Sequence, residues 1–334
     1  MLAAADFGNY GIWSPPLISE HGGSVDLLIT TLHWFMLALF IPWGIFMLYC
    51  LVRFRQGNGH KAVYEPVKGK ISKYAEIGVV LFETFLLVGM SIPVWADYKN
   101  NPPKESDRMV VRVVAEQFQW NFHYPGPDGK FGRTDARLVD TTSNPVGLDE
   151  NDPNAADDVW TINDFHIPTG KNIYLRLTSK DVIHSFFIPS MRVKQDVIPG
   201  MEIPIWFKVQ EEATTEHLKA EMTRNYPTAG ANWYKLRHLV AMKDYADKSG
   251  QVILATGANL GTSRATGTAL LEQLRAAGVE EISMQPLNPL EVVCAQLCGN
   301  SHFTMKAQIV THTPEGFDQW IQEQSKEEEF DEDF

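Results

Sequence analysis

Cysteine is scarce in this chain, with three among 334 residues. A small secreted domain held by disulfides needs a denser, even set of cysteines, so that class is excluded. No Cys-x-x-Cys-His motif occurs, so no c-type haem is attached covalently. Basic charge is also in deficit, with 29 Lys and Arg against 41 Asp and Glu and a net charge of −12. Such an acidic balance excludes nucleic acid as a partner and favours basic proteins.

Residues 27–52 contain no charged side chain, and residues 75–96 contain very few. The second run is interrupted only by Glu76 and Glu83. Each run is long enough, as a helix rising about 1.5 Å per residue, to cross roughly 30 Å of hydrocarbon. The sequence therefore predicts a transmembrane helical hairpin over residues 24–98, with spans at about 27–52 and 75–96.

The two ends of the first span differ in basic charge. The tail at 1–23 contains no Lys or Arg, whereas the loop at 53–73 is rich in both. Loops rich in Lys and Arg stay in the cytoplasm. We therefore expect a cytoplasmic loop, with both termini and the domain after the second span on the periplasmic side. The membrane would be a bacterial inner membrane rather than a mitochondrial one.

After Pro102 and Pro103 the sequence changes to short runs of β-branched and aromatic residues separated by Gly and Pro. These properties are typical of β-strands. Several such strands in succession predict a β-sandwich or Greek-key barrel, here over residues 104–210 and 286–316. The runs are 109–124, 173–179, 182–189, 203–209, 290–298 and 303–312.

Three stretches depart from this strand pattern. Residues 129–165 are rich in Asp, Asn, Pro and Gly, which predicts a long surface excursion. Residues 211–285 place apolar side chains at helical spacing, which predicts an inserted helical subdomain. Residues 317–334 form an acidic C-terminal tail, and we expect its last part, 323–334, to be disordered.

Two of the three cysteines lie in one short stretch, "CAQLCGNSHFTM" at 294–305. The stretch contains Cys294, Cys298, His302 and Met305. Soft sulfur beside imidazole favours copper, or less often zinc. His184, in "DVIHSFFIP", is a candidate for a further ligand from a strand end. A zinc site of two cysteines and two histidines would leave the thioether unused. A mononuclear blue-copper site uses one cysteine only, so the second cysteine argues against it.

These two motifs, the two spans and the β-rich domain together resemble subunit II of haem–copper cytochrome c oxidase. The resemblance implies a cupredoxin-like fold and a binuclear copper centre of the CuA type. Cys294 and Cys298 would bridge both coppers. His184 and Met305 would complete one copper, and His302 with the backbone carbonyl of Gln296 would complete the other.

The resemblance also implies a function and partners. The chain would accept electrons from a c-type cytochrome and pass them to haem in subunit I, which holds haem and CuB and reduces oxygen to water while protons are translocated. Subunit III and membrane lipid would be further partners, and the donor could belong to a respiratory supercomplex. A CuA subunit of a nitric oxide reductase and a copper-binding assembly protein are the alternatives.

Four positions need comment against the family pattern. Gln296 stands where the family has a Glu that helps to bind Mg²⁺, and an amide is a weaker ligand for this hard cation, which puts magnesium in doubt. Phe118 stands where the family has the first tryptophan of the aromatic stretch proposed for electron entry, and Trp120 matches the second. Glu76 matches the glutamate at the entrance of a proton channel, and ionisable groups within spans are functional by default.

Overall fold

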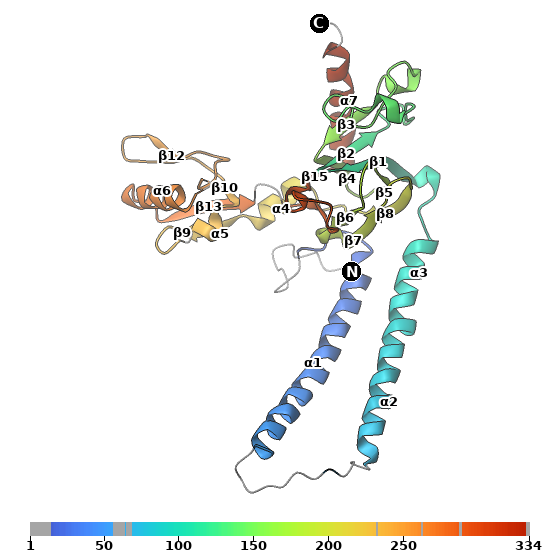
Figure 1. The fold of residues 1–334 in the computed structure, drawn as a ribbon. Helices are drawn as coiled ribbons and strands as arrows, with labels where there is room; N and C mark the ends of the chain where they lie inside the picture. The colour runs from blue at the N-terminus through green and yellow to red at the C-terminus, as the bar shows by residue number, and fades with distance from the viewer. Residues whose placement is uncertain are drawn as a thin grey trace. The chain divides into compact units, whose positions relative to one another are not determined.

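The structure, a computed structural model, describes residues 15–55, 64, 69–231, 233–261, 263–286 and 289–331. It comprises two compact units, one formed by His21–Pro102 and the other by Met1–Glu20 with Pro103–Phe334 (Figure 1). Most of the predicted tail, at 1–14, and most of the predicted loop, at 56–63 and 65–68, lie outside the described residues. Residues 332–334 also lie outside them.

The first unit is a pair of long apolar helices. Helix α1 spans Gly22–Arg53 and contains Pro42 without interruption. The second stretch consists of α2 (Lys70–Thr84), a π-helical segment η1 (Phe85–Ser91) and α3 (Ile92–Asn100). Both stretches are long and apolar enough to span a membrane. The two stretches touch through Phe35 and Phe82, whose ring centroids are 4.5 Å apart. The two predicted spans are confirmed, and both helices run a few residues further.

The second unit contains two five-stranded sheets. Strands pair antiparallel except for β1 with β5 and β4 with β15, which are parallel. The first sheet has the order β3 (Val159–Ile162), β2 (Gln119–Tyr124), β1 (Arg108–Glu116), β5 (Asn172–Ser179), β8 (Ile203–Lys208). The second has the order β4 (Asp164–Pro168), β15 (Lys306–His312), β14 (Glu291–Cys294), β6 (His184–Ile188), β7 (Val193–Val197).

The sheets pack face to face because alternate residues of their strands are apolar. In β5 the side chains of Ile173, Leu175 and Leu177 are fully buried, while those between them face outward. Aromatic rings fill the space between the sheets. Phe122 stacks on Phe165 at 4.5 Å, and Trp120 meets Phe186 edge-on at 5.3 Å between centroids. The predicted cupredoxin-like sandwich is confirmed.

Several strand predictions need correction. The run 109–124 forms two strands, β1 and β2, since the chain turns at residues 117–118, where no Gly or Pro marks a turn. The predicted surface excursion ends earlier than 165, because β3 and β4 occupy its last residues. The tail before the first span is also not wholly separate. Ile18 and Ser19 are buried in the β-unit, and Ser19 forms a β-bridge with Val209 beside β8.

The insert at 211–285 contains strands as well as helices. Helices α4 (Thr215–Met222) and α6 (Arg264–Ala276) confirm its helical character. The helical pattern at 232–250, however, holds only the short α5 (Trp233–Leu236), and β10 (Leu239–Ala241) follows it. Pairing of β10 with a distant strand overrode the local helical pattern. The remaining strands are β9 (Arg224–Pro227), β11 (Tyr245–Ala246), β12 (Val252–Leu254) and β13 (Glu281–Pro286).

The expected disordered end is helical as far as Asp331. Helix α7 spans Pro314–Asp331 and begins directly after β15. Phe317 and Ile321, four residues apart, are buried, and the Trp320 ring stacks on His166 at 4.1 Å between centroids. One apolar face at helical spacing therefore docks this acidic segment on the sandwich.

The insert has its own hydrophobic core, which includes Leu271, Leu274, Ile282 and Met284. We predict that Leu274→Ala, which leaves a cavity in this core, destabilises the insert by about 2–5 kcal/mol. Hydrogen exchange should quicken for amides of residues 224–286 and stay unchanged for β5 and β6. Glu272→Ala, at an exposed position of the same helix, is the control. Equal acceleration in β5 would show that the two cores unfold together.

A second prediction concerns His312, whose Nε2 lies 2.8 Å from Nδ1 of His166. Burial, and then the nearby His166, lower the pKa of His312 to about 4. The unfolded chain would bind a proton here below pH 6.5 that the folded chain refuses, so the contribution of His312 to stability should fall from pH 6.5 toward pH 4. The free energy of unfolding, measured from pH 6.5 to pH 4, should therefore fall less steeply for His312→Gln than for wild type. His238→Gln, at an exposed histidine, should follow wild type.

Candidate metal centre

Strand pairing places the sulfur-rich stretch beside His184. His184 is the first residue of β6 and Cys294 is the last of β14, and these strands pair antiparallel with Cys294 opposite Phe186. The loop from 295 to 305 then folds back so that β15 pairs with β14 on its other side. The side chains that the sequence places far apart thus meet at one end of the second sheet.

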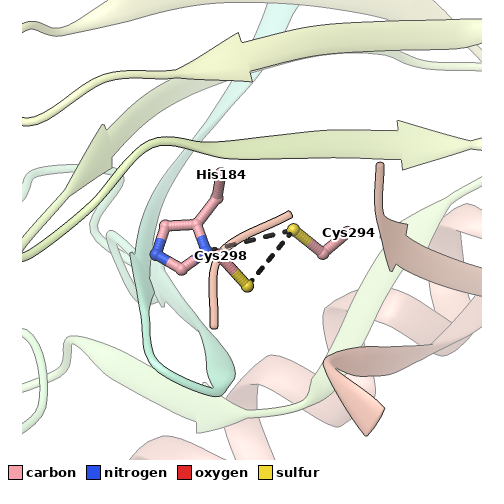
Figure 2. Close-up of side chains that lie close together, drawn as sticks. All are labelled: His184, Cys294 and Cys298. Carbon is pink, nitrogen blue, oxygen red and sulfur yellow. Dashed lines mark hydrogen bonds between the residues drawn. The ribbon is translucent and has the colours of Figure 1, made fainter. Parts of the chain in front are cut away.

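Five side chains converge there, and Figure 2 shows three of them, with the imidazole of His184 and the sulfurs of Cys294 and Cys298 facing one another. The Cys294 sulfur lies 3.9 Å from His184 Nδ1 and 3.9 Å from the Cys298 sulfur. The Cys298 sulfur lies 3.5 Å from His302 Nδ1 and 3.7 Å from the Met305 sulfur. Both cysteines are free thiols, and His184, Cys294, Cys298 and Met305 are buried.

These spacings fit a metal ion. Ligand bonds of about 2.0–2.3 Å in a tetrahedral arrangement separate neighbouring donor atoms by about 3.3–3.8 Å. The sulfur–nitrogen and sulfur–sulfur separations in the cluster, 3.5–3.9 Å, fall within or just beyond this range. Thiolate, imidazole and thioether together form a soft donor set, which suits copper best.

A backbone oxygen also points toward the cluster. The Cys294 thiol donates a hydrogen bond of 3.2 Å to the carbonyl of Gln296. The side chain of Gln296 is exposed. The backbone carbonyl of this residue thus faces the cluster, while its amide side chain faces away from the protein interior. The carbonyl predicted as a ligand therefore lies within reach of the thiols.

The thiols differ in their electrostatic surroundings. Burial opposes ionisation of Cys294, but the contacts with His184 and with the backbone of Ser185 and Gln296 together outweigh it, so the pKa of the Cys294 thiol is lowered. Burial and the neighbouring Cys294 raise the pKa of the Cys298 thiol. Without a cation, only one of the two sulfurs is thus disposed to carry negative charge. A cation that touches both sulfurs would remove this conflict, since a coordinating thiol is deprotonated outright.

Asp181 holds His184 in place from the opposite side of its ring. Asp181 Oδ1 lies 2.8 Å from His184 Nε2, which leaves Nδ1 facing the sulfurs. The other carboxylate oxygen accepts a hydrogen bond of 2.7 Å from the backbone N–H of Gln117. Histidine ligands commonly donate their second N–H to a carboxylate, which fixes the ring and its tautomer.

The turn between β1 and β2 packs against the cysteine loop. The Gln117 side chain donates a hydrogen bond to the carbonyl of Cys298. Gly299 has a φ of +145°, and a Cβ there would lie 2.7 Å from Gln117 Nε2 and 2.9 Å from the Phe118 ring. Glycine is therefore required for this close approach.

The other predicted residues have distinct positions. Phe118 is half-buried against Gly299, whereas Trp120 is fully buried, with its ring edge-on to His184 at 6.1 Å between centroids. Glu76 lies on α2, in the other unit, with an exposed side chain. Sequence reasoning missed Asp181 and Gln117. The first lies three residues before His184 and could have been suspected, but nothing in the sequence marks the second.

Known proteins resemble this chain in sequence. Residues 109–217 match the model of a family described as cytochrome c oxidase subunit II, periplasmic domain. The alternative cytochrome c oxidase subunit 2 of Bradyrhizobium diazoefficiens is 32% identical over 236 residues, which cover 70% of this chain and 80% of that protein. The chain belongs to the cytochrome c oxidase subunit II family. The haem–copper oxidase subunit 2 of Aeropyrum pernix is 29% identical over 213 residues, covering 56% of this chain and 76% of that protein.

Membership of the subunit II family makes the chain one subunit of a haem–copper oxidoreductase complex, anchored in a membrane and carrying a periplasmic domain. A crystal structure of the periplasmic domain of subunit II from Bradyrhizobium japonicum covers 68% of this chain and 99% of its own, with 19% identity and a TM-score of 0.33. The family match ends at 217, close to where the insert begins.

We predict that Asp181→Ala lowers copper affinity about 10–100-fold, because His184 loses the carboxylate that orients its ring. Competition with a copper chelator measures this on the full chain in detergent. Asp181→Asn keeps an oxygen acceptor for His184 and should lower the copper affinity much less. Asp196→Ala, at a half-exposed carboxylate of the same sheet, is the control, and equal losses in it and Asp181→Ala would refute the role of Asp181.

Proposed function

We propose that the chain is the electron-entry subunit of a terminal respiratory oxidase. It would accept electrons from a c-type cytochrome at a binuclear CuA centre and deliver them to haem in subunit I, where oxygen is reduced to water and protons are translocated. The observation that carries the proposal is the convergence of two thiols, two imidazoles and a thioether in one cluster.

The ligands are assigned by position. Cys294 and Cys298 would bridge the two coppers. His184 with Met305 would complete one copper, and His302 with the Gln296 carbonyl the other. A bound copper pair supplies one-electron transfer with the odd electron shared over both metals. In support, each of the terminal ligands lies within 3.9 Å of a bridging sulfur.

The protein's own task is to keep these ligands still. Electron transfer at small driving force requires that the site change shape little, which rigid supports ensure. Asp181 fixes the His184 ring, and Gln117 fixes the carbonyl of Cys298. Burial of both thiols keeps water from the donors, and it favours retention of a metal over its transfer to another protein. This argues against the assembly-protein alternative.

Exposed apolar side chains near the cluster support a docking surface for the cytochrome. Leu297 and Phe303 lie in the cysteine loop with 77% of each exposed, and Ile183 precedes His184 with 46% exposed. Apolar patches of this kind mark protein interaction sites. Electrons would enter through Phe118, which reaches the loop at Gly299, whereas Trp120 lies behind His184 and is shielded.

The remaining assignments follow the family. Glu76 would gather protons at the mouth of a channel shared with subunit I, and its exposed position on α2 is compatible with that role. Both termini and the copper domain would lie in the periplasm, with subunits I and III and lipid around the two spans. Magnesium at the border with subunit I stays in doubt, since Gln296 offers a neutral amide.

Paramagnetic resonance of the copper-loaded full chain tests the proposal. We expect the hyperfine pattern of one electron shared equally by two copper nuclei, which differs from the four-line pattern of a single copper. Cys298→Ser should abolish the shared pattern, since it removes a bridge, whereas His238→Asn, at an exposed histidine of the insert, should leave it intact. A four-line spectrum from the wild-type chain would exclude a binuclear centre.

A further inference from the structure

The outward face of the first sheet places two guanidinium groups side by side. Arg112 in β1 is the register partner of Arg176 in β5, the neighbouring parallel strand. Like charges directly opposite each other on neighbouring strands destabilise a sheet. Burial and the nearby Arg176 both lower the pKa of Arg112, which is half-buried. The pair therefore costs free energy unless an anion compensates it.

Carboxylates of the described residues compensate the pair only in part. Arg176 Nε lies 3.7 Å from Glu202 Oε1, a distance near the upper limit for an ion pair. Arg112 has no carboxylate within 4.0 Å among the residues that the structure describes. It donates a hydrogen bond of 3.3 Å to the carbonyl of Gly132, and its Cζ lies 4.1 Å from the centre of the Phe131 ring.

A pocket of about 590 Å³ opens directly onto both guanidinium groups. Its wall is formed by the sheet on one side and the excursion, at 134–146, on the other. Lys180 and His123 add further nitrogen groups to the lining. Two acidic residues, Asp135 and Glu202, also line it. Pockets of several hundred Å³ with a few convergent polar groups are typical of small-molecule sites.

Most other charged groups around the pocket already have close partners. Lys180 pairs with Glu116 at 3.0 Å, and Asp135 accepts hydrogen bonds from the Arg137 guanidinium. The carboxylates of Asp158 and Glu202 attract Arg112. Neither lies within ion-pair distance of its guanidinium, so the remaining N–H groups of Arg112 have no direct carboxylate partner among the described residues.

Buried contacts hold the pocket wall in position. Asp158, fully buried, lies 2.7 Å from His123 Nε2 and accepts a hydrogen bond of 2.8 Å from the N–H of Gly132. These contacts fix the excursion at Phe131 and Gly132, which are the two residues that touch Arg112. The Arg112 guanidinium is thus held by the Gly132 carbonyl and the Phe131 ring. Guanidinium groups suit planar anions because their N–H groups form a planar fork.

We propose that this pocket is a binding site for a small oxyanion, a phosphate or carboxylate group held between Arg112 and Arg176. The site is separate from the metal centre, because none of its lining residues contributes a donor there. A guanidinium pair matches the oxygens of either group bidentately. Free phosphate and a dicarboxylate are the two sources of this chemistry.

Calorimetric titration of the full chain in detergent, at constant ionic strength, tests the site with inorganic phosphate and with succinate as probes. We expect saturable binding of one equivalent of at least one probe, and the probe that saturates identifies the source. Arg112→Gln and Arg176→Gln should each weaken binding about tenfold or more, as expected for loss of a charge-assisted hydrogen bond. Lys130→Gln removes one positive charge from the same excursion outside the pocket lining and should bind as wild type does.

Thermal unfolding supplies an independent measurement. The bound anion should raise the melting temperature of wild type but not of the two Gln variants. If Arg112→Gln fails to fold, Arg112→Lys, which keeps the charge but loses the planar fork, replaces it and should bind several-fold more weakly. Absence of saturable binding with both probes, or wild-type affinity in the variants at both arginines, overturns the proposal.

Discussion

The antiparallel pairing of β14 with β6 is the constraint on which the metal centre depends. It places Cys294 next to the start of β6, so that a sulfur and an imidazole separated by 110 positions in the chain come within 3.9 Å. The hairpin of β14 with β15 then returns the loop, and with it Cys298, His302 and Met305, to the same end of the sheet. Shifting either register by one residue would turn Cys294 to the other face of the sheet and separate the donors.

The support of the centre comes from the other sheet. The turn between β1 and β2 carries Gln117, which donates to the Cys298 carbonyl through its side chain and to Asp181 through its backbone. One residue therefore touches both the cysteine loop and the carboxylate that orients His184. Packing of the two sheets, through Trp120 on Phe186 and on His184, sets the distance at which these contacts form. The geometry of the donors thus depends on the whole sandwich rather than on the loop alone.

The sequence singles out most of the proposed donors because their chemistry is rare and local. Two cysteines, a histidine and a methionine within one short loop identify the kind of site before any fold is known. His184 could be named only through the motif around it, since a single histidine on an apolar strand carries no local signal. Gln117 was not found, because its role arises from a turn that meets the site across the sandwich. Asp181 was also missed, although it lies only three residues before His184. Long apolar runs predicted both spans for the opposite reason, as their signal is confined to each helix.

The insert shows where local patterns fail. Leu239, Val240 and Ala241 fit a helix by spacing, yet they form β10, because pairing with β13 buries them in a core that only the folded insert creates. The same non-local pairing explains why the insert leaves the site intact. Its start is tied to the sandwich where Thr215 Oγ1 accepts a hydrogen bond of 2.8 Å from the Thr311 N–H in β15. The strands on either side of it, β8 and β14, keep their own partners in separate sheets. A long insertion at this point therefore costs loop-closure entropy but no contact of the metal centre.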